Sequence, residues 1–141
     1  MRHLLSLSVI GAAAAVAMAC GGGGSSPTAP SGGGGGTGGT GGATSSATII
    51  IGANGVASPS TVTVTQGGRV TFVNNNSRSH DMSSDPHPSH EDCPPLAQVG
   101  LLAPGQSKTS GNLNTVRVCG FHDHNLPTST GLQGRITIVA Q

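Results

Sequence analysis

The chain has 141 residues, and its charges nearly balance, with six Lys and Arg against five Asp and Glu. It contains no Trp or Tyr and only two Phe. The sequence shows no basic patch of the kind that attracts the phosphate backbone, which argues against a nucleic-acid-binding function. The scarcity of aromatic residues also excludes a stacking platform for bases or sugars.

The first 20 residues have the pattern of an export signal. A short basic start, Arg2 and His3, precedes an apolar, alanine-rich stretch that ends at Cys20. This stretch is too short for a membrane span, which takes about 20 strongly apolar residues. Its last residues, AMAC, resemble a bacterial lipobox, in which the cysteine is lipidated. We therefore expect an exported protein, anchored to a bacterial membrane through Cys20 at the periplasm or cell surface. An ordinary cleavable signal peptide is the alternative.

Residues 21–47 are almost entirely Gly, Ser, Thr, Ala and Pro. Such a segment cannot bury enough apolar surface to offset its ordering entropy, so we expect a disordered tether. As a flexible coil it would span on the order of 28 Å. Residues 48–141 remain as one folded domain, large enough for one small core.

Within residues 48–141 the apolar pattern is that of strands, and no helical period is visible. The expected strands are, in chain order, 48–51, 60–65, 69–73, 99–102, 115–119 and 135–139, with a weaker segment at 107–113. A long irregular region is expected between residues 74 and 95. About six to eight short strands separated by turn residues predict an all-β sandwich.

Two clusters carry the chemistry of this domain. His80 follows the strand RVTFV and three asparagines, while Cys119 is followed by His122 and His124 near the last strand. A thiolate and two imidazoles on a rigid sandwich favour a soft or borderline metal ion, and copper is the natural candidate.

Four segments, in order, resemble the cupredoxin family of plastocyanin and pseudoazurin: SPSTVTVTQGGRVTFVNN, the APGQS turn, the Cys-x2-His motif and GLQGRITI. The resemblance covers the whole domain and implies a Greek-key β-sandwich that binds one copper ion. It implies His80, Cys119 and His122 as metal ligands. The family's axial methionine position falls on Leu132, which cannot ligate. The loop before Leu132 is longer than in plastocyanin, and its His124 is expected to replace or join His122.

Cys93 leaves two interpretations open. Two cysteines in an oxidising compartment form a disulfide by default, and a Cys93–Cys119 bond would leave only imidazoles and carboxylates near His80. The interpretation preferred from the sequence is a free Cys119 bound to copper, with Cys93 as a spare thiol or extra ligand.

The remaining polar residues of this region also have alternatives. His87 and His90 lie in a proline-rich loop and are either solvated or part of a second metal site. Asp81 and Asp123 each follow a candidate ligand, so each either orients an imidazole or is a solvated loop carboxylate.

Four functions follow, and the first is preferred. They are one-electron transfer with a redox partner protein, copper capture and delivery between a donor and an acceptor, a copper enzyme with an open coordination position, and a metal-free, disulfide-closed binding module. An electron carrier or metal binder is favoured over an enzyme. We expect a monomer whose membrane contact is the lipid anchor.

Overall fold

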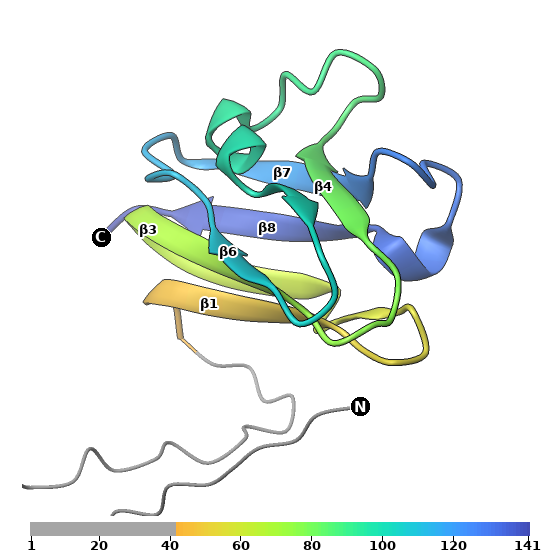
Figure 1. Cartoon of the computed structure of the whole chain (residues 1–141). Coiled ribbons are helices and arrows are strands. Elements are labelled where there is room, and N and C mark those ends of the chain that lie inside the picture. Colours follow the sequence, from red (N-terminus) through yellow and green to blue (C-terminus); the bar gives the residue numbers. More distant parts are fainter. Residues whose placement is uncertain (1–41) are drawn as a thin grey trace, which may run out of the picture. The chain divides into compact units, whose positions relative to one another are not determined.

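The computed structural model describes residues 42–141 (Figure 1). The predicted leader, the lipidation site Cys20 and residues 21–41 of the predicted tether lie outside the described residues. No helix in the described part of the chain is long and apolar enough to cross a membrane. The first strand begins at Thr44, within the predicted tether, because Ala47 pairs with Val70 and packs against the core.

The described residues form eight strands and two short 3₁₀ helices, as predicted for an all-β domain. The strands are β1 (Thr44–Ile51), β2 (Ala57–Ser58), β3 (Thr61–Asn74), β4 (His80–Ser84), β5 (Gly100–Leu102), β6 (Ser107–Thr109), β7 (Arg117–Asp123) and β8 (Gly134–Val139). The helices are η1 (Pro94–Gln98) and η2 (Thr130–Leu132).

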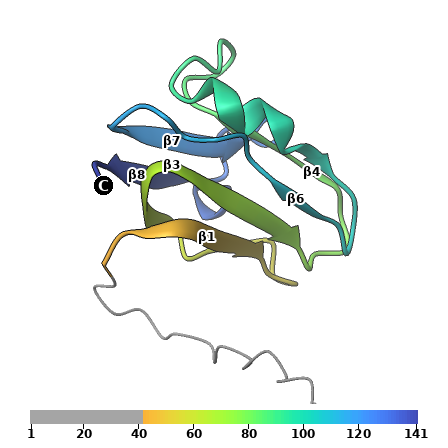
Figure 2. The same ribbon diagram turned by 90° about the vertical axis from the view of Figure 1, so that its left-hand side faces the viewer.

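The strand order is β2-β1-β3-β8-β7-β4-β5, and β6 pairs separately with β3. The β1/β3 and β3/β8 pairs are parallel, whereas β7 runs antiparallel to both β8 and β4. In both ribbon views β1 and β7 lie on opposite sides, with β3 and β8 between them (Figures 1 and 2).

The two strands expected at 60–65 and 69–73 form one long strand, β3. Gly67 has a φ of +81°, and a Cβ at Gly68 would lie 2.7 Å from the carbonyl oxygen of Thr65. Glycine tolerates both conditions, so the expected turn becomes a bend inside the strand. The first half of β3 pairs with β8, and the second half pairs with β1 and β6.

Strand β4 lies in the region expected to be irregular. Although its sequence, HDMSS, is mostly polar, the burial of its side chains alternates as in other strands. His80, Met82 and Ser84 are buried, and the two residues between them are half-buried. This strand pairs with β5 on one side and β7 on the other. The site residues on β4 and β7 are therefore held by a sheet and not by a loop.

The core is mostly aliphatic, as the composition predicts, with its two phenylalanines in contact. Phe72 of β3 and Phe121 of β7 are both buried, and their rings pack edge to face with centroids 5.3 Å apart. An edge-to-face aromatic pair stabilises the fold by more than the burial of its apolar surface alone would. It joins the strand at the centre of the sheet to the strand that carries the candidate site.

Gly134, the first residue of β8, provides a test of this packing. A Cβ there would overlap the carbonyl oxygen of Ser60 and the ring of Phe121. We expect Gly134→Ala to lower the free energy of unfolding by about 2–4 kcal/mol, because strand or ring must move. Gly131→Ala is the control, since its Cβ would make an ordinary 3.4 Å contact with Val56. Chemical denaturation measures both; equal losses would contradict the packing described.

Candidate metal centre

Cys93 and Cys119 form a disulfide, with their Cα atoms 5.8 Å apart. Both residues are buried, Cys93 directly before η1 and Cys119 within β7. A sulfur in a disulfide is not a thiolate, so the preferred prediction of Cys119 as a copper ligand is corrected. The alternative that the sequence left open, a Cys93–Cys119 bond, is the one that the structure shows.

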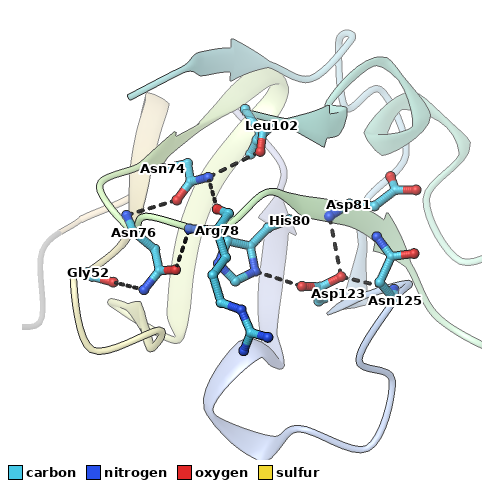
Figure 3. Close-up of polar contacts among 9 residues, drawn as sticks. All are labelled: Gly52, Asn74, Asn76, Arg78, His80, Asp81, Leu102, Asp123 and Asn125. Atoms are coloured by element: carbon cyan, nitrogen blue, oxygen red, sulfur yellow. Dashed lines mark hydrogen bonds and ion pairs between the residues drawn. The ribbon is translucent and has the colours of Figure 1, made fainter. Parts of the chain in front are cut away.

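The partner of His80 is Asp123. The Nδ1 atom of His80 lies 2.7 Å from Oδ2 of Asp123, and both side chains are almost completely buried (Figure 3). The second carboxylate oxygen accepts the backbone N–H groups of Asp81 at 3.3 Å and Asn125 at 2.9 Å. Because a carboxylate only accepts, His80 donates through Nδ1. Asp123 therefore orients an imidazole, as one sequence interpretation allowed, although that imidazole is His80.

Strand register explains why Cys119 does not face His80. Asp123 pairs with Met82 on β4, two residues from His80, whereas Cys119 pairs with Ile136 on β8. The four steps along the chain from Cys119 to Asp123 cover about 13 Å of extended strand, at about 3.3 Å per step. The expected grouping of His80 with Cys119 and His122 is therefore not present. Leu132, the expected axial position, is buried in η2 and borders an open hollow of about 430 Å³ beside His80.

Two buried asparagines hold the segment that leads into His80. The side-chain amide of Asn74 donates to the carbonyl oxygens of Arg78 at 2.8 Å and Leu102 at 3.1 Å, and its oxygen accepts the N–H of Asn76 (Figure 3). Asn76 accepts the N–H of Arg78 in turn. The asparagine run therefore satisfies the backbone of the turn that begins β4.

The structure gathers four histidines at a different place. His87 and His90 come from the segment between β4 and η1, while His122 is the second-last residue of β7 and His124 follows that strand. One ring nitrogen from each of the four residues lies within 4.8 Å of those of the other three. Nδ1 of His124 and Nε2 of His90 lie 3.1 Å apart, within hydrogen-bond distance. We call this set the four-histidine cluster.

Asp85 fixes the orientation of His122 within this cluster. Its Oδ1 lies 2.6 Å from Nδ1 of His122, so that nitrogen donates and Nε2 keeps a free lone pair. The Nε2 atom is buried and has no hydrogen-bond partner. A metal-ligating histidine usually donates from one ring nitrogen to a carboxylate or carbonyl group, and its other nitrogen has a free lone pair for the metal.

The approach of Asp85 depends on Gly120. A Cβ at Gly120 would overlap the Asp85 carboxylate, and the Asp85 N–H also donates to the Gly120 carbonyl oxygen at 3.1 Å. Only glycine leaves room for a carboxylate beside His122 while the backbone bond forms.

His90 is held in an unusual backbone conformation. Its φ is +55°, in the left-handed region that non-glycine residues rarely adopt. Its N–H donates to the Pro86 carbonyl oxygen at 2.7 Å, and its carbonyl oxygen accepts the Ser84 hydroxyl at 2.7 Å. Desolvation lowers the pKa of His90 below its ordinary value, and repulsion from His122 and the other two cluster histidines lowers it further. The neutral, ligating form of the ring is therefore favoured.

The donors of the cluster suit a borderline transition metal. Imidazole nitrogen binds zinc, copper and nickel, whereas calcium and magnesium prefer oxygen. The predicted ligands His122 and His124 both belong to the cluster, while His80 does not. His87 and His90, for which a second metal site was one open interpretation, complete it. The pair His87 and His90 (H-x2-H) and the pair His122 and His124 (H-x-H) are visible in the sequence. That the two pairs lie together depends on the fold.

Comparisons with known proteins identify the fold. No family model matches the sequence, and no curated protein matches it. Among solved structures, the purple cupredoxin from Nitrosopumilus maritimus is 20% identical with a TM-score of 0.51, covering 65% of this chain and 98% of that chain. Dithionite-reduced auracyanin from Roseiflexus castenholzii is 21% identical with a TM-score of 0.52, covering 70% and 99%. A Cu(I) amicyanin mutant is 14% identical with a TM-score of 0.51, covering 67% and 82%. The chain has the cupredoxin fold, as predicted.

The buried pair of His80 and Asp123 should be essential to stability. Asp123→Ala leaves the buried His80 ring and two N–H groups without their acceptor, so we expect a loss of about 3–5 kcal/mol in the free energy of unfolding. The neighbouring, half-buried Asp81 is the control, and its replacement by Ala should cost less than about 1 kcal/mol. Urea denaturation measures both variants, and a small loss for Asp123→Ala would contradict the assigned role.

The lowered pKa of His90 predicts how stability depends on pH. Below the ordinary histidine pKa of about 6.5, the unfolded chain takes up a proton that folded His90 resists. The metal-free protein should therefore lose stability as the pH falls from 8 to 5, and a His90→Gln variant should lose less. Thermal unfolding in the presence of a chelator measures both slopes. Identical slopes would contradict the stated environment of His90.

Proposed function

We propose that this protein, with its cupredoxin fold and its four-histidine cluster, is an exported copper-binding protein that captures and delivers one copper ion. His87, His90, His122 and His124 would hold the ion. The observation that carries the proposal is that one ring nitrogen from each of these four histidines lies within 4.8 Å of those of the other three.

Copper is favoured over other metals by the donor set. Among divalent first-row ions, Cu²⁺ binds a given nitrogen site most tightly. The described cysteines are joined to each other, and Met82, on β4, is buried in the core. Soft thiolate and thioether ligands, which favour Cu⁺, are therefore not part of the proposed centre. An all-imidazole site supports binding of the oxidised ion.

Capture and delivery is supported by the position of the cluster. His122 is buried at the end of a strand, but His87 is exposed and His90 and His124 are half-buried. A donor or acceptor protein could therefore approach the ligands directly and exchange them one at a time. The leader and the Cys20 lipobox suggest that such partners would be met at a membrane surface outside the cytoplasm.

One-electron transfer is the second candidate. Two of the similar structures are reduced forms, a dithionite-reduced auracyanin and a Cu(I) amicyanin mutant. This function would require the imidazoles to keep their positions in both oxidation states of copper. Reversible voltammetry with little change in the metal spectrum would favour electron transfer over delivery.

The proposed function is tested by titrating the full chain with Cu²⁺. We expect one tightly bound ion, a pale visible spectrum without an intense thiolate-to-copper band, and electron paramagnetic resonance couplings to imidazole nitrogens. His122→Ala should weaken binding most, because it removes the buried ligand. Asp85→Asn should weaken it by about 10- to 100-fold, since the carboxylate orients His122.

Asp92→Asn is the matched control, because Asp92 is a carboxylate of the same segment that contacts Arg117 and none of the histidines. Its copper affinity should equal that of the unaltered chain. Unchanged affinity in His122→Ala, or an intense thiolate band in the unaltered protein, would overturn the proposal.

A further inference from the structure

We infer that the Cys93–Cys119 disulfide is a redox-controlled clamp on the four-histidine cluster, and that its reduction by a dithiol weakens metal binding. The inference rests on the proposed metal site and deepens it. It assigns a role to the one covalent link between the two parts of the chain that supply the histidines.

The position of the disulfide within the sequence is the first observation. His90 and Cys93 are separated by two residues, and so are Cys119 and His122. The bond therefore joins the 85–93 segment to β7 at three residues from a cluster histidine on each side. Side chains alternate along β7, so Cys119 faces the core while His122 faces the segment. The clamp is thus next to the metal centre without being part of its ligand set.

The other contacts of the 85–93 segment are the second observation. At its start, Asp85 is bonded to Gly120 and His122, and Ser84 contacts the His90 carbonyl oxygen. Two further hydrogen bonds, from His90 to Pro86 and from Asp92 to Asp85, remain within the segment.

At the end of the segment, the contacts besides the disulfide are weaker. The Asp92–Arg117 pair is 3.6 Å long between side chains that are about 40% exposed, which contributes little. The next buried anchor is Leu96 in η1. Without the disulfide, the second half of the segment would be held to the body by the Ser84–His90 hydrogen bond, the His90–His124 contact and the exposed Asp92–Arg117 pair, up to Leu96 in η1.

The disulfide therefore affects how far the four-histidine cluster is preorganised before metal binds. With the bond intact, the ring nitrogens of His87 and His90 are already near those of His122 and His124 before metal arrives. With the bond broken, metal binding must also order several backbone residues, including His90 in its left-handed conformation. That cost appears as lost affinity, on the order of 10- to 100-fold. The domain itself should remain folded, because no strand pair involves residues 85–93 and Cys93 is the one core residue that this segment contributes.

A small hollow borders Cys93, and none of the cluster histidines lines it. Cys93 lines a hollow of about 50 Å³, together with Pro94, Pro95, Leu113 and Arg117. The Arg117 guanidinium at this hollow favours an incoming thiolate over a thiol. The thiolate of an external dithiol forms a bond to Cys93 and releases Cys119 as a thiolate. The second thiol of the reductant then displaces Cys93, so the dithiol leaves as a disulfide and both protein cysteines end reduced.

The experiment uses Zn²⁺ as the probe, because Zn²⁺ binds imidazole nitrogen and does not change its oxidation state. All chains carry Cys20→Ser, so that only the disulfide differs between samples. Zinc affinity is measured by competition with a chromophoric chelator for the oxidised chain and for the Cys93→Ser, Cys119→Ser double variant. We expect the double variant to bind on the order of 10- to 100-fold more weakly. An Asp92→Asn chain, with the disulfide intact, is the control and should match the oxidised chain.

Amide hydrogen exchange provides a readout that does not depend on metal binding. In the metal-free double variant, residues 86–92 should exchange at least about 10-fold faster than in the oxidised chain, while β3 and β8 stay protected. Equal exchange in the segment overturns the clamp whether or not metal binds. Equal zinc affinity of the two chains overturns it as well. If the oxidised chain binds no metal, the proposed function fails, and faster exchange would still establish the clamp on the segment.

Discussion

The antiparallel register of β7 against β4 and β8 is the constraint on which the site depends. Because side chains alternate along a strand, one register sends Cys119, Phe121 and Asp123 to the core and His122 to the opposite face. A slip by one residue would exchange these faces and break the disulfide, the aromatic pair and the His80–Asp123 contact together. These three contacts therefore specify the register, and His122, buried on the opposite face of the strand, is positioned as a result.

Two imidazole–carboxylate pairs occur in the described residues, in different environments. His80 with Asp123 and His122 with Asp85 are both imidazole–carboxylate contacts through Nδ1, at 2.7 Å and 2.6 Å. Asp123 is completely buried and also accepts two backbone N–H groups, so this pair stabilises the entry to β4. Asp85 is about half exposed and faces the four-histidine cluster. The two pairs have the same residue types, so it is their surroundings that make His80–Asp123 a structural pair and His122–Asp85 part of a candidate metal site.

Much of the fold could be predicted from the sequence because it rests on local signals. Alternating β-branched residues and glycine turns indicated the strands on either side of Gly67 and the last strand at 135–139, and four ordered motifs indicated the cupredoxin fold. Strand β4 was missed because its serines and aspartate concealed the alternation. The extent of β7 was underestimated because the strand continues past Cys119 to Asp123. Both errors concern polar residues whose burial depends on distant partners.

The candidate site was predicted less completely, for a related reason. The Cys-x2-His motif singled out His122 and the longer loop singled out His124, both of which lie in the four-histidine cluster, but the family resemblance grouped Cys119 with His80. Which residue faces His80 is decided by the pairing of β7 with β4, a contact between residues about 40 positions apart. The choice between a thiolate and a disulfide likewise depends on where Cys93 lies in space. Local sequence carries no signal for either.

Gly120 has a consequence for how such domains diverge. The absence of a Cβ at this position gives the Asp85 carboxylate its place beside His122, although Gly120 itself supplies no ligand. A duplicated copy that acquired any side chain there could keep its sandwich, its disulfide and all four histidines, and still lose the alignment of the centre. Among descendants of this chain, one small residue would then distinguish lineages that retain the imidazole–carboxylate contact from those that retain only the fold.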